Sequence, residues 1–139
     1  MNKKIIILGV ILLGVAYYLL SPLFIVKTGD DISPIGNTSL YGSLIPSAHD
    51  VSGKASIIES EGKKVLRFED LDTINGPDLY IYLATDSSAS DFVNLGKIKA
   101  TKGNVNYEIP LGTDLEKYDT VLIWCKQFSV LFSYAELKK

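Results

Sequence analysis

Sulfur and imidazole ligands for metals are scarce in this sequence, which contains one cysteine, Cys125, one histidine, His49, and one methionine, at position 1. A blue-copper centre needs two histidines besides its cysteine, and a structural zinc site normally needs four Cys or His ligands. One chain therefore completes neither set, nor a Cys-x-x-Cys-His haem motif. Two arrangements remain open: a mixed site of His49, Cys125 and carboxylates, or a non-covalent haem with one of these two residues as axial ligand. The prosthetic group is left unknown, and no complete metal-ligand set is predicted.

Signatures of two other protein classes are also missing. The chain has no Gly-x-Ser-x-Gly motif, so nothing indicates nucleophilic hydrolysis. Residues 28–139 carry eleven basic and sixteen acidic side chains, a net charge of −5, and no stripe of Lys and Arg interleaved with aromatics. Because an acidic domain repels phosphate backbones, nucleic acid is not expected as a partner.

The longest apolar run of the chain lies near its N-terminus. Residues Ile5 to Val26 carry no charge, and about 20 apolar helical residues suffice to cross a membrane. No polar cleavage zone follows a short apolar core, which favours an uncleaved signal anchor over a removed signal peptide. Lys3 and Lys4 precede the run and only Lys27 follows it, so the positive-inside rule keeps the N-terminus in the cytoplasm. We expect a single-pass protein of the cell membrane with its C-terminal domain outside the cytoplasm.

Beyond the anchor the pattern is that of β structure. We divide the chain into an anchor (residues 1–27), a polar linker punctuated by glycine and proline (28–38) and a β domain (39–139). Short β-type runs recur about every ten residues in the last part, the spacing of sandwiches and barrels. The prediction is an all-β, antiparallel sandwich or barrel-like domain of about eight strands. The expected strands are 39–46, 53–59, 64–71, 79–84, 93–99, 104–109, 120–125 and 129–137.

The only cysteine and the only tryptophan are neighbours at the end of one of these strands. In the strand 120–125, Val121, Ile123 and Cys125 would face one side, while Leu122 and Trp124 would face the other. A short turn then leads into the strand 129–137, so the two strands form a hairpin with Cys125 at its rim. A thiol there is either a small buried hydrophobe or a group kept for exchange or ligation. Both interpretations stay open at this stage.

Glycines, prolines and aromatics follow one another in a characteristic order along the β-rich part. The positions concerned are His49-Asp50-Val51-Ser52-Gly53, Gly76-Pro77-Asp78-Leu79, Tyr82-Leu83, Leu95-Gly96, Gly103, Tyr107, Pro110, Val121 to Cys125, Phe128, Val130, Phe132, Ala135 and Leu137. With these residues the chain resembles the electron-transfer DM-13 domain family from about Leu40 to Leu137. Members are small β-rich extracytoplasmic domains often found beside DOMON and cytochrome-type membrane modules.

The resemblance implies a role in redox chemistry or electron transfer. It makes Cys125 the suspected redox thiol or prosthetic-group ligand, with Trp124 beside it as a further cofactor-binding residue. Gly76, Pro77 and Asp78 are implied to shape a loop next to that cysteine and to take part in cofactor binding. His49 matches a family position without being assigned as a ligand. No DOMON or cytochrome module accompanies the domain in this sequence, so the expected electron partner is a redox protein or cytochrome in trans.

Two functions follow from these observations. The first is a membrane-anchored extracytoplasmic module with a redox or electron-transfer role centred on Cys125. The alternative is a non-catalytic binding or accessory module in which that cysteine is structural. Either interpretation makes the protein a module of a larger system more than a stand-alone enzyme.

Overall fold

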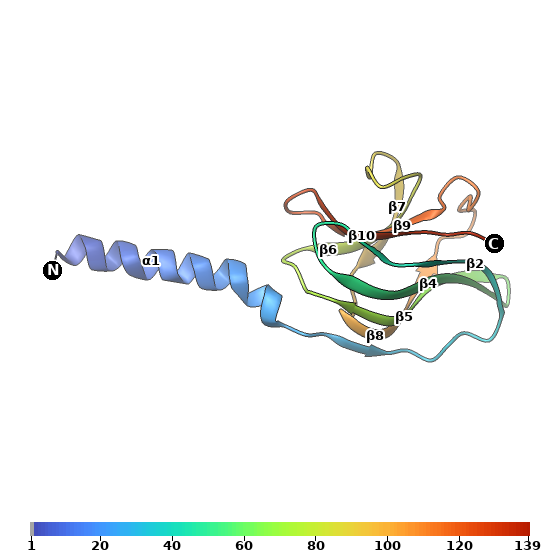
Figure 1. The fold of residues 1–139 in the computed structure, drawn as a ribbon, viewed down its shortest axis with the longest axis horizontal. Coiled ribbons are helices and arrows are strands. Elements are labelled where there is room, and N and C mark those ends of the chain that lie inside the picture. The colour runs from blue at the N-terminus through green and yellow to red at the C-terminus, as the bar shows by residue number, and fades with distance from the viewer. Residues whose placement is uncertain (1) are drawn as a thin grey trace.

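A single long helix precedes a β-rich domain in the computed structural model, which describes residues 2–139 (Figure 1). Helix α1, Lys3–Leu20, has 18 residues, a length of about 27 Å that is close to the thickness of a bilayer's hydrocarbon core. None of its side chains is buried, and it is long and apolar enough to cross a membrane. A short 3-10 helix, Ser21–Phe24, follows it.

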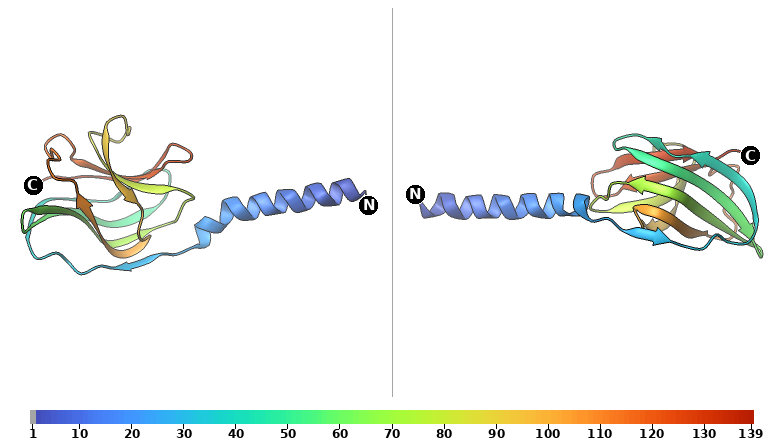
Figure 2. Two further views of the ribbon diagram at one scale, coloured as in Figure 1. Left: turned by 180° about the vertical axis from the view of Figure 1, so that it is seen from behind. Right: turned by 60° about the horizontal axis from the view of Figure 1, so that its bottom comes forward.

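The domain consists of two five-stranded sheets packed face to face (Figures 1 and 2). The first has the order β1-β8-β5-β4-β2 and the second β3-β10-β9-β6-β7. All strand pairs are antiparallel except β1 with β8. The strands are β1 Thr28–Asp30, β2 Asn37–Ser43, β3 Ile45–Pro46, β4 Val51–Ser60, β5 Lys63–Thr73, β6 Leu79–Ala84, β7 Phe92–Lys97, β8 Lys102–Ile109, β9 Thr120–Cys125 and β10 Val130–Glu136. The predicted all-β class and N-terminal helix are confirmed.

The eight expected strands all have counterparts, and two more are present. Strand β6 and strand β9 have the predicted bounds, because each is a continuous apolar run between turn residues. The first expected strand, 39–46, is split by a break at Leu44 into β2 and β3, which join different sheets.

The second extra strand, β1, lies in the range that the sequence predicts to be a linker. The carbonyl oxygen of Lys27 accepts hydrogen bonds from the backbone N–H groups of Thr101 and Lys102, at 2.7 and 3.1 Å. Figure 2 shows β1 continuing from there alongside β8. A Cβ at Gly103 would overlap the carbonyl oxygen of Gly29, so glycine permits this close approach. The chain is thus fixed to the domain from Lys27 onward.

A buried arginine holds the stretch that follows β1. Arg67 on β5 is almost fully buried, and its guanidinium donates to the backbone oxygen of Asp31 (3.0 Å), to Asn106 Oδ1 (2.9 Å) and to Glu69 Oε1 (2.9 Å). The Asp31 carboxylate in turn accepts from the backbone N–H of Asn106, at 2.8 Å. These charge-assisted hydrogen bonds hold Asp31, which follows the end of β1, against β5 and β8.

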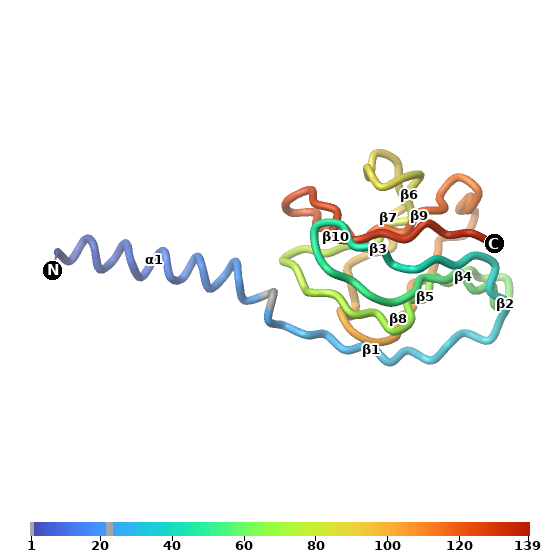
Figure 3. Tube along the Cα trace, in the orientation of Figure 1, coloured from blue at the N-terminus to red at the C-terminus, as the bar shows by residue number. Residues whose placement is uncertain are grey.

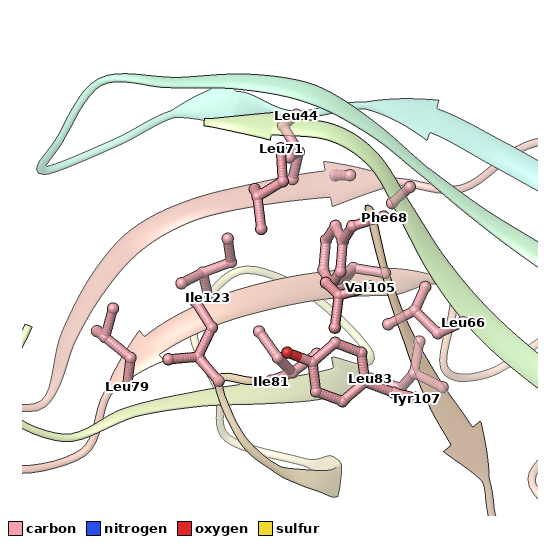
Figure 4. Close-up of a cluster of buried hydrophobic side chains, with 14 of the residues drawn as sticks. Leu44, Leu66, Phe68, Leu71, Leu79, Ile81, Leu83, Val105, Tyr107 and Ile123 are labelled. Carbon is pink, nitrogen blue, oxygen red and sulfur yellow. The ribbon is translucent and has the colours of Figure 1, made fainter. Parts of the chain in front are cut away.

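The main hydrophobic core lies between the two sheets. Residues on β9 alternate as predicted: Val121, Ile123 and Cys125 belong to this core, while Leu122 packs on the opposite face of its sheet with Tyr82. Figure 4 shows ten labelled side chains filling the space between the layers. They are Leu44, Leu66, Phe68, Leu71, Leu79, Ile81, Leu83, Val105, Tyr107 and Ile123.

Candidate functional site

Three loops meet at the end of the sandwich from which α1 departs (Figure 3). They are residues 47–50 before β4, residues 74–78 between β5 and β6, and residues 126–129 between β9 and β10. Strand pairing fixes their common location, because Val51 pairs with Thr73 and Leu79 pairs with Cys125. We call this end, which is the one bearing the Lys27 attachment, the near end, and the opposite one the far end.

Cys125 is the last residue of β9 and lies at the near end. It is a free thiol with a relative exposure of 1%, and it faces the inter-sheet core. The next residue, Lys126, donates its backbone N–H to the carbonyl oxygen of Asp78 at 2.9 Å, which ties the hairpin to the 74–78 loop. The sulfur therefore sits just beneath the loops.

An apolar pocket of about 320 Å³ reaches Cys125 from this end. His49 contributes the only other polar side chain in its lining. The remaining wall is apolar and includes one residue of the N-terminal helix: Leu19, Pro77, Phe128, Val130 and Phe132. The structure therefore brings the sole thiol and the sole imidazole of the chain to one pocket.

His49 is held in place by β10. Its backbone N–H donates to the carbonyl oxygen of Phe132 at 3.3 Å, and its ring contacts the Phe132 ring in a tilted arrangement, with centroids 4.2 Å apart and an interplanar angle of 56°. The neighbouring Asp50 does not share the pocket, since it lines a separate cavity of about 400 Å³ with Asp72. No three His, Cys, Asp or Glu side chains converge on a metal position within residues 2–139. The mixed site with carboxylates that the sequence leaves open is thus not formed around Cys125 in the described part of the chain.

The model of the electron transfer DM13 family matches residues 43–137, about two thirds of the chain, and this range includes strands β3 to β10. The chain belongs to the electron transfer DM13 family. No curated protein and no solved structure is similar enough to add to this comparison.

The glycine-proline loop of this DM13 domain borders the pocket, as the family resemblance implies. A Cβ at Gly76 would lie 2.9 Å from Phe132 Cζ and 3.0 Å from Leu79 Cδ2, so only glycine fits there without displacement. Pro77 forms part of the pocket wall, and the Asp78 carboxylate lies 3.6 Å from the Lys97 ammonium. Trp124 differs from these residues, because its half-buried ring packs on the opposite face of the sheet and does not line the pocket.

A β-bulge in β10 shapes the other wall of the pocket. Leu131 pairs with Trp124 and Ser133 pairs with the adjacent Ile123, so Phe132 is the extra residue between them. The bulge breaks the expected alternation: Phe132 and Ser133 are both buried. Ser133 is left with a hydroxyl that has no hydrogen-bond partner in the described part of the chain. Bulges re-aim side chains in this way beside functional sites.

Four pocket residues are not assigned to a site by sequence reasoning: Leu19, Phe128, Val130 and Phe132. The apolar alternation at residues 128–132 is visible in the sequence and predicts a buried face. It carries no information on the bulge, nor on which loop lies opposite. Leu19 belongs to the apolar helix, and its contact with the domain depends on the length of the connection.

Proposed function

We propose that this protein is a membrane-anchored electron-transfer module whose redox centre is the Cys125 pocket. One observation carries the proposal: a DM13 domain collects its only thiol and its only imidazole in a single apolar pocket at the near end. Small-molecule and cofactor sites are mostly apolar cavities in which a few polar groups converge.

Helix α1 supplies the anchor in this proposal. The lysine pair Lys3 and Lys4 precedes the apolar segment, and this favours a cytoplasmic N-terminus with the DM13 domain on the extracytoplasmic side of the cell membrane. The nearest basic residue on the domain side is Lys27, which is fixed to the domain through its backbone.

The size of the pocket restricts the group that it can hold. About 320 Å³ is at the lower end of the range of about 300–1,000 Å³ for small-molecule sites. It suits a small group of a few rings better than a porphyrin. Such a group, held by the Cys125 sulfur and the His49 imidazole, would accept and release the electrons. The apolar wall of Phe128, Val130 and Phe132 limits the access of water to Cys125, which is almost fully buried, while His49 is half-buried.

A single thiol needs a second reaction partner. With one cysteine the chain cannot form an intrachain disulfide, so storage of electrons at Cys125 requires a bound group or the thiol of another protein. The proposal therefore includes a redox protein or cytochrome in trans as electron partner.

A second candidate function is a non-catalytic binding or accessory module, and one observation favours it. Cys125 is almost completely buried and packs in the main core, as an inert structural cysteine would. In that case its replacement changes stability and leaves any redox property of the protein unaffected.

Optical redox titration of the full-length protein isolated from its native membrane separates the two candidates. We expect a redox-active absorption band that Cys125→Ser abolishes or shifts in midpoint potential. Trp124→Phe is the matched control, since it changes the neighbouring residue on the opposite face of β9 and should leave the titration unchanged. Thermal unfolding verifies that both variants are folded. The absence of any redox-active band, or identical titrations of wild type and folded Cys125→Ser, would contradict the proposed function.

A further inference from the structure

We propose that the near end docks onto the same membrane that α1 spans, with Phe128 inserted into the interfacial layer of the bilayer. The pocket of Cys125 then opens toward lipid. This inference rests on the membrane-anchor part of the proposed function and not on the redox part.

The connection between helix and domain is too short to hold them apart. Helix α1 ends at Leu20, and Lys27 is already hydrogen-bonded to Thr101. The six residues between them span at most about 20 Å when fully extended. Four of these form the 3-10 helix, which rises only about 2 Å per residue. Leu19, in the last turn of α1, lines the pocket itself.

The loop at residues 126–129 has the composition of an interfacial segment. Phe128 at its tip is 56% exposed, although it forms part of the pocket wall. Lys126 precedes it, and the lysine ammonium lies 5.2 Å from the centre of the Tyr80 ring. An exposed aromatic ring beside a lysine and a tyrosine is the arrangement that favours the boundary between headgroups and acyl chains.

Apolar surface continues from the helix to this loop. Phe24, Ile25 and Val26 are exposed in the connection, and Ile74 is exposed in the neighbouring near-end loop. The first three follow a helix whose apolar side chains are exposed along its length, and Ile74 lines one cavity together with Ile25 and Val26. A bilayer around α1 lies within reach of the entire near end. Continuity with the anchor is the reason for assigning lipid, and not a protein partner, as the occupant of this surface.

Quenching by lipids brominated in their acyl chains tests the proposal on the full chain in lipid nanodiscs. Trp124→Phe removes the native tryptophan, and a single reporter is then placed by Phe128→Trp. Leu111→Trp is the far-end control, because Leu111 follows the end of β8 and is 85% exposed. Tyr18→Trp reports on α1 itself, where Tyr18 is 69% exposed. We expect strong quenching for Tyr18→Trp, quenching at least half as large for Phe128→Trp, and little for Leu111→Trp.

Each other outcome overturns the docking proposal in a recognisable way. Equal, weak quenching of Phe128→Trp and Leu111→Trp, with Tyr18→Trp strongly quenched, means that the anchor is embedded and the domain stands away from the bilayer. A Phe128→Trp fluorescence that resists aqueous acrylamide and also resists brominated lipid means that a second copy of the chain, and not lipid, covers the loop. An unquenched Tyr18→Trp means that α1 is not embedded, and the anchor part of the proposed function then fails as well. Near-ultraviolet circular dichroism confirms that every variant is folded.

Discussion

The two ends of the sandwich are formed by the same strands but differ in character: the far end carries exposed polar groups, and the near end carries a buried thiol. Strand β9 begins at the far end with Thr120 and finishes at the near end with Cys125. At the far end, Asp91 forms an exposed cluster with Lys117 (2.8 Å) and with the hydroxyl of Tyr118, which donates to it at 2.9 Å. At the near end, the thiol of Cys125, the last residue of the strand, lies beneath an apolar wall.

The two ends should therefore differ in their sensitivity to substitution. Exposed ion pairs contribute little to stability and tolerate change, because water and salt screen them. A buried thiol beneath three loops depends on the packing of every loop around it. We therefore expect substitutions at the near end to change both stability and thiol chemistry, and substitutions at the far end to change neither to a large extent.

The largest effect is expected for Phe132→Ala. Removal of this buried ring enlarges the pocket beneath His49 and Gly76 and should lower the free energy of unfolding by about 3–5 kcal/mol. Phe92→Ala is the matched control, since Phe92 is partly exposed and its ring stacks on that of Tyr82 with centroids 4.0 Å apart. Removal of this ring should lower the free energy of unfolding by about 1 kcal/mol. Urea unfolding measures both. Equal losses would contradict the contrast between a packed pocket wall and an exposed sheet edge.

A comparison of Cys125→Ser with Cys125→Ala tests whether the pocket is dry. Serine is closer to cysteine in size, yet its hydroxyl finds few hydrogen-bond partners among the apolar side chains around this position. We expect Cys125→Ser to be about 1–2 kcal/mol less stable than Cys125→Ala. Urea unfolding of the two variants provides the difference. If Cys125→Ser is as stable as Cys125→Ala, or more stable, the pocket contains water that hydrogen-bonds to the serine hydroxyl.

Tyr107, in the core between the two ends, should make the stability of the domain depend on pH in the alkaline range. Burial raises the pKa of Tyr107 to about 12, although the backbone N–H of Lys99 donates to its hydroxyl at 2.9 Å. Because the folded state favours the neutral phenol, this contribution to stability is complete below pH 10 and decreases as the pH rises from about 10 toward 12. Tyr107→Phe should be about 1 kcal/mol less stable at neutral pH and should lose less stability above pH 10. Thermal unfolding of both proteins at a series of pH values tests this. If wild type and Tyr107→Phe lose stability in parallel, ionisation of Tyr107 is not the cause of the loss.

The smallest effect is expected at the far end. Hydrogen bonds from Lys117 and Tyr118 hold the pKa of Asp91 below its ordinary value. Its contribution to stability is thus present above the ordinary carboxyl pKa and is lost as the pH falls through the lowered one. Lys117→Met should raise the Asp91 pKa in a carboxyl-carbon NMR titration while leaving the Cys125 pocket unchanged. An unaltered Asp91 titration would mean that the cluster does not persist in solution.

Sequence reasoning recovers the sandwich because its strands follow local rules. The runs of β6 and β9 are apolar, of strand length and bounded by turn residues, so both bounds and facing are predicted. Strand β1 is missed for a physical reason. Gly29 and Asp30 are residue types depleted in strands, so Thr28 stands alone as a strand former. The segment pairs with β8 because Lys27 and Asp31 are hydrogen-bonded to residues distant in the chain.

The site is recovered only in part. The hairpin turn after Cys125 places the thiol at a rim, and the family resemblance places the Gly76-Pro77-Asp78 loop beside it. The meeting of His49 with Cys125 depends on the pairing of β10 with the 47–50 loop. These residues are distant in the chain, and no local pattern specifies that pairing. The bulge at Phe132 moves the buried positions of β10 from Phe132 to Ser133 and Ala135, and the simple alternation predicted for this strand does not contain that shift.

Thiol labelling in intact native membranes tests most directly whether the buried cysteine is reachable from the apolar side of the near end. Only Cys125 can react, so mass spectrometry of the whole protein gives an unambiguous readout. We expect a small apolar maleimide to modify the folded protein and a charged, membrane-impermeant maleimide to leave it unmodified. Failure of both reagents until the protein is unfolded would contradict a functional pocket and identify Cys125 as a structural core residue. Rapid modification by the charged reagent would contradict an apolar, lipid-facing entrance.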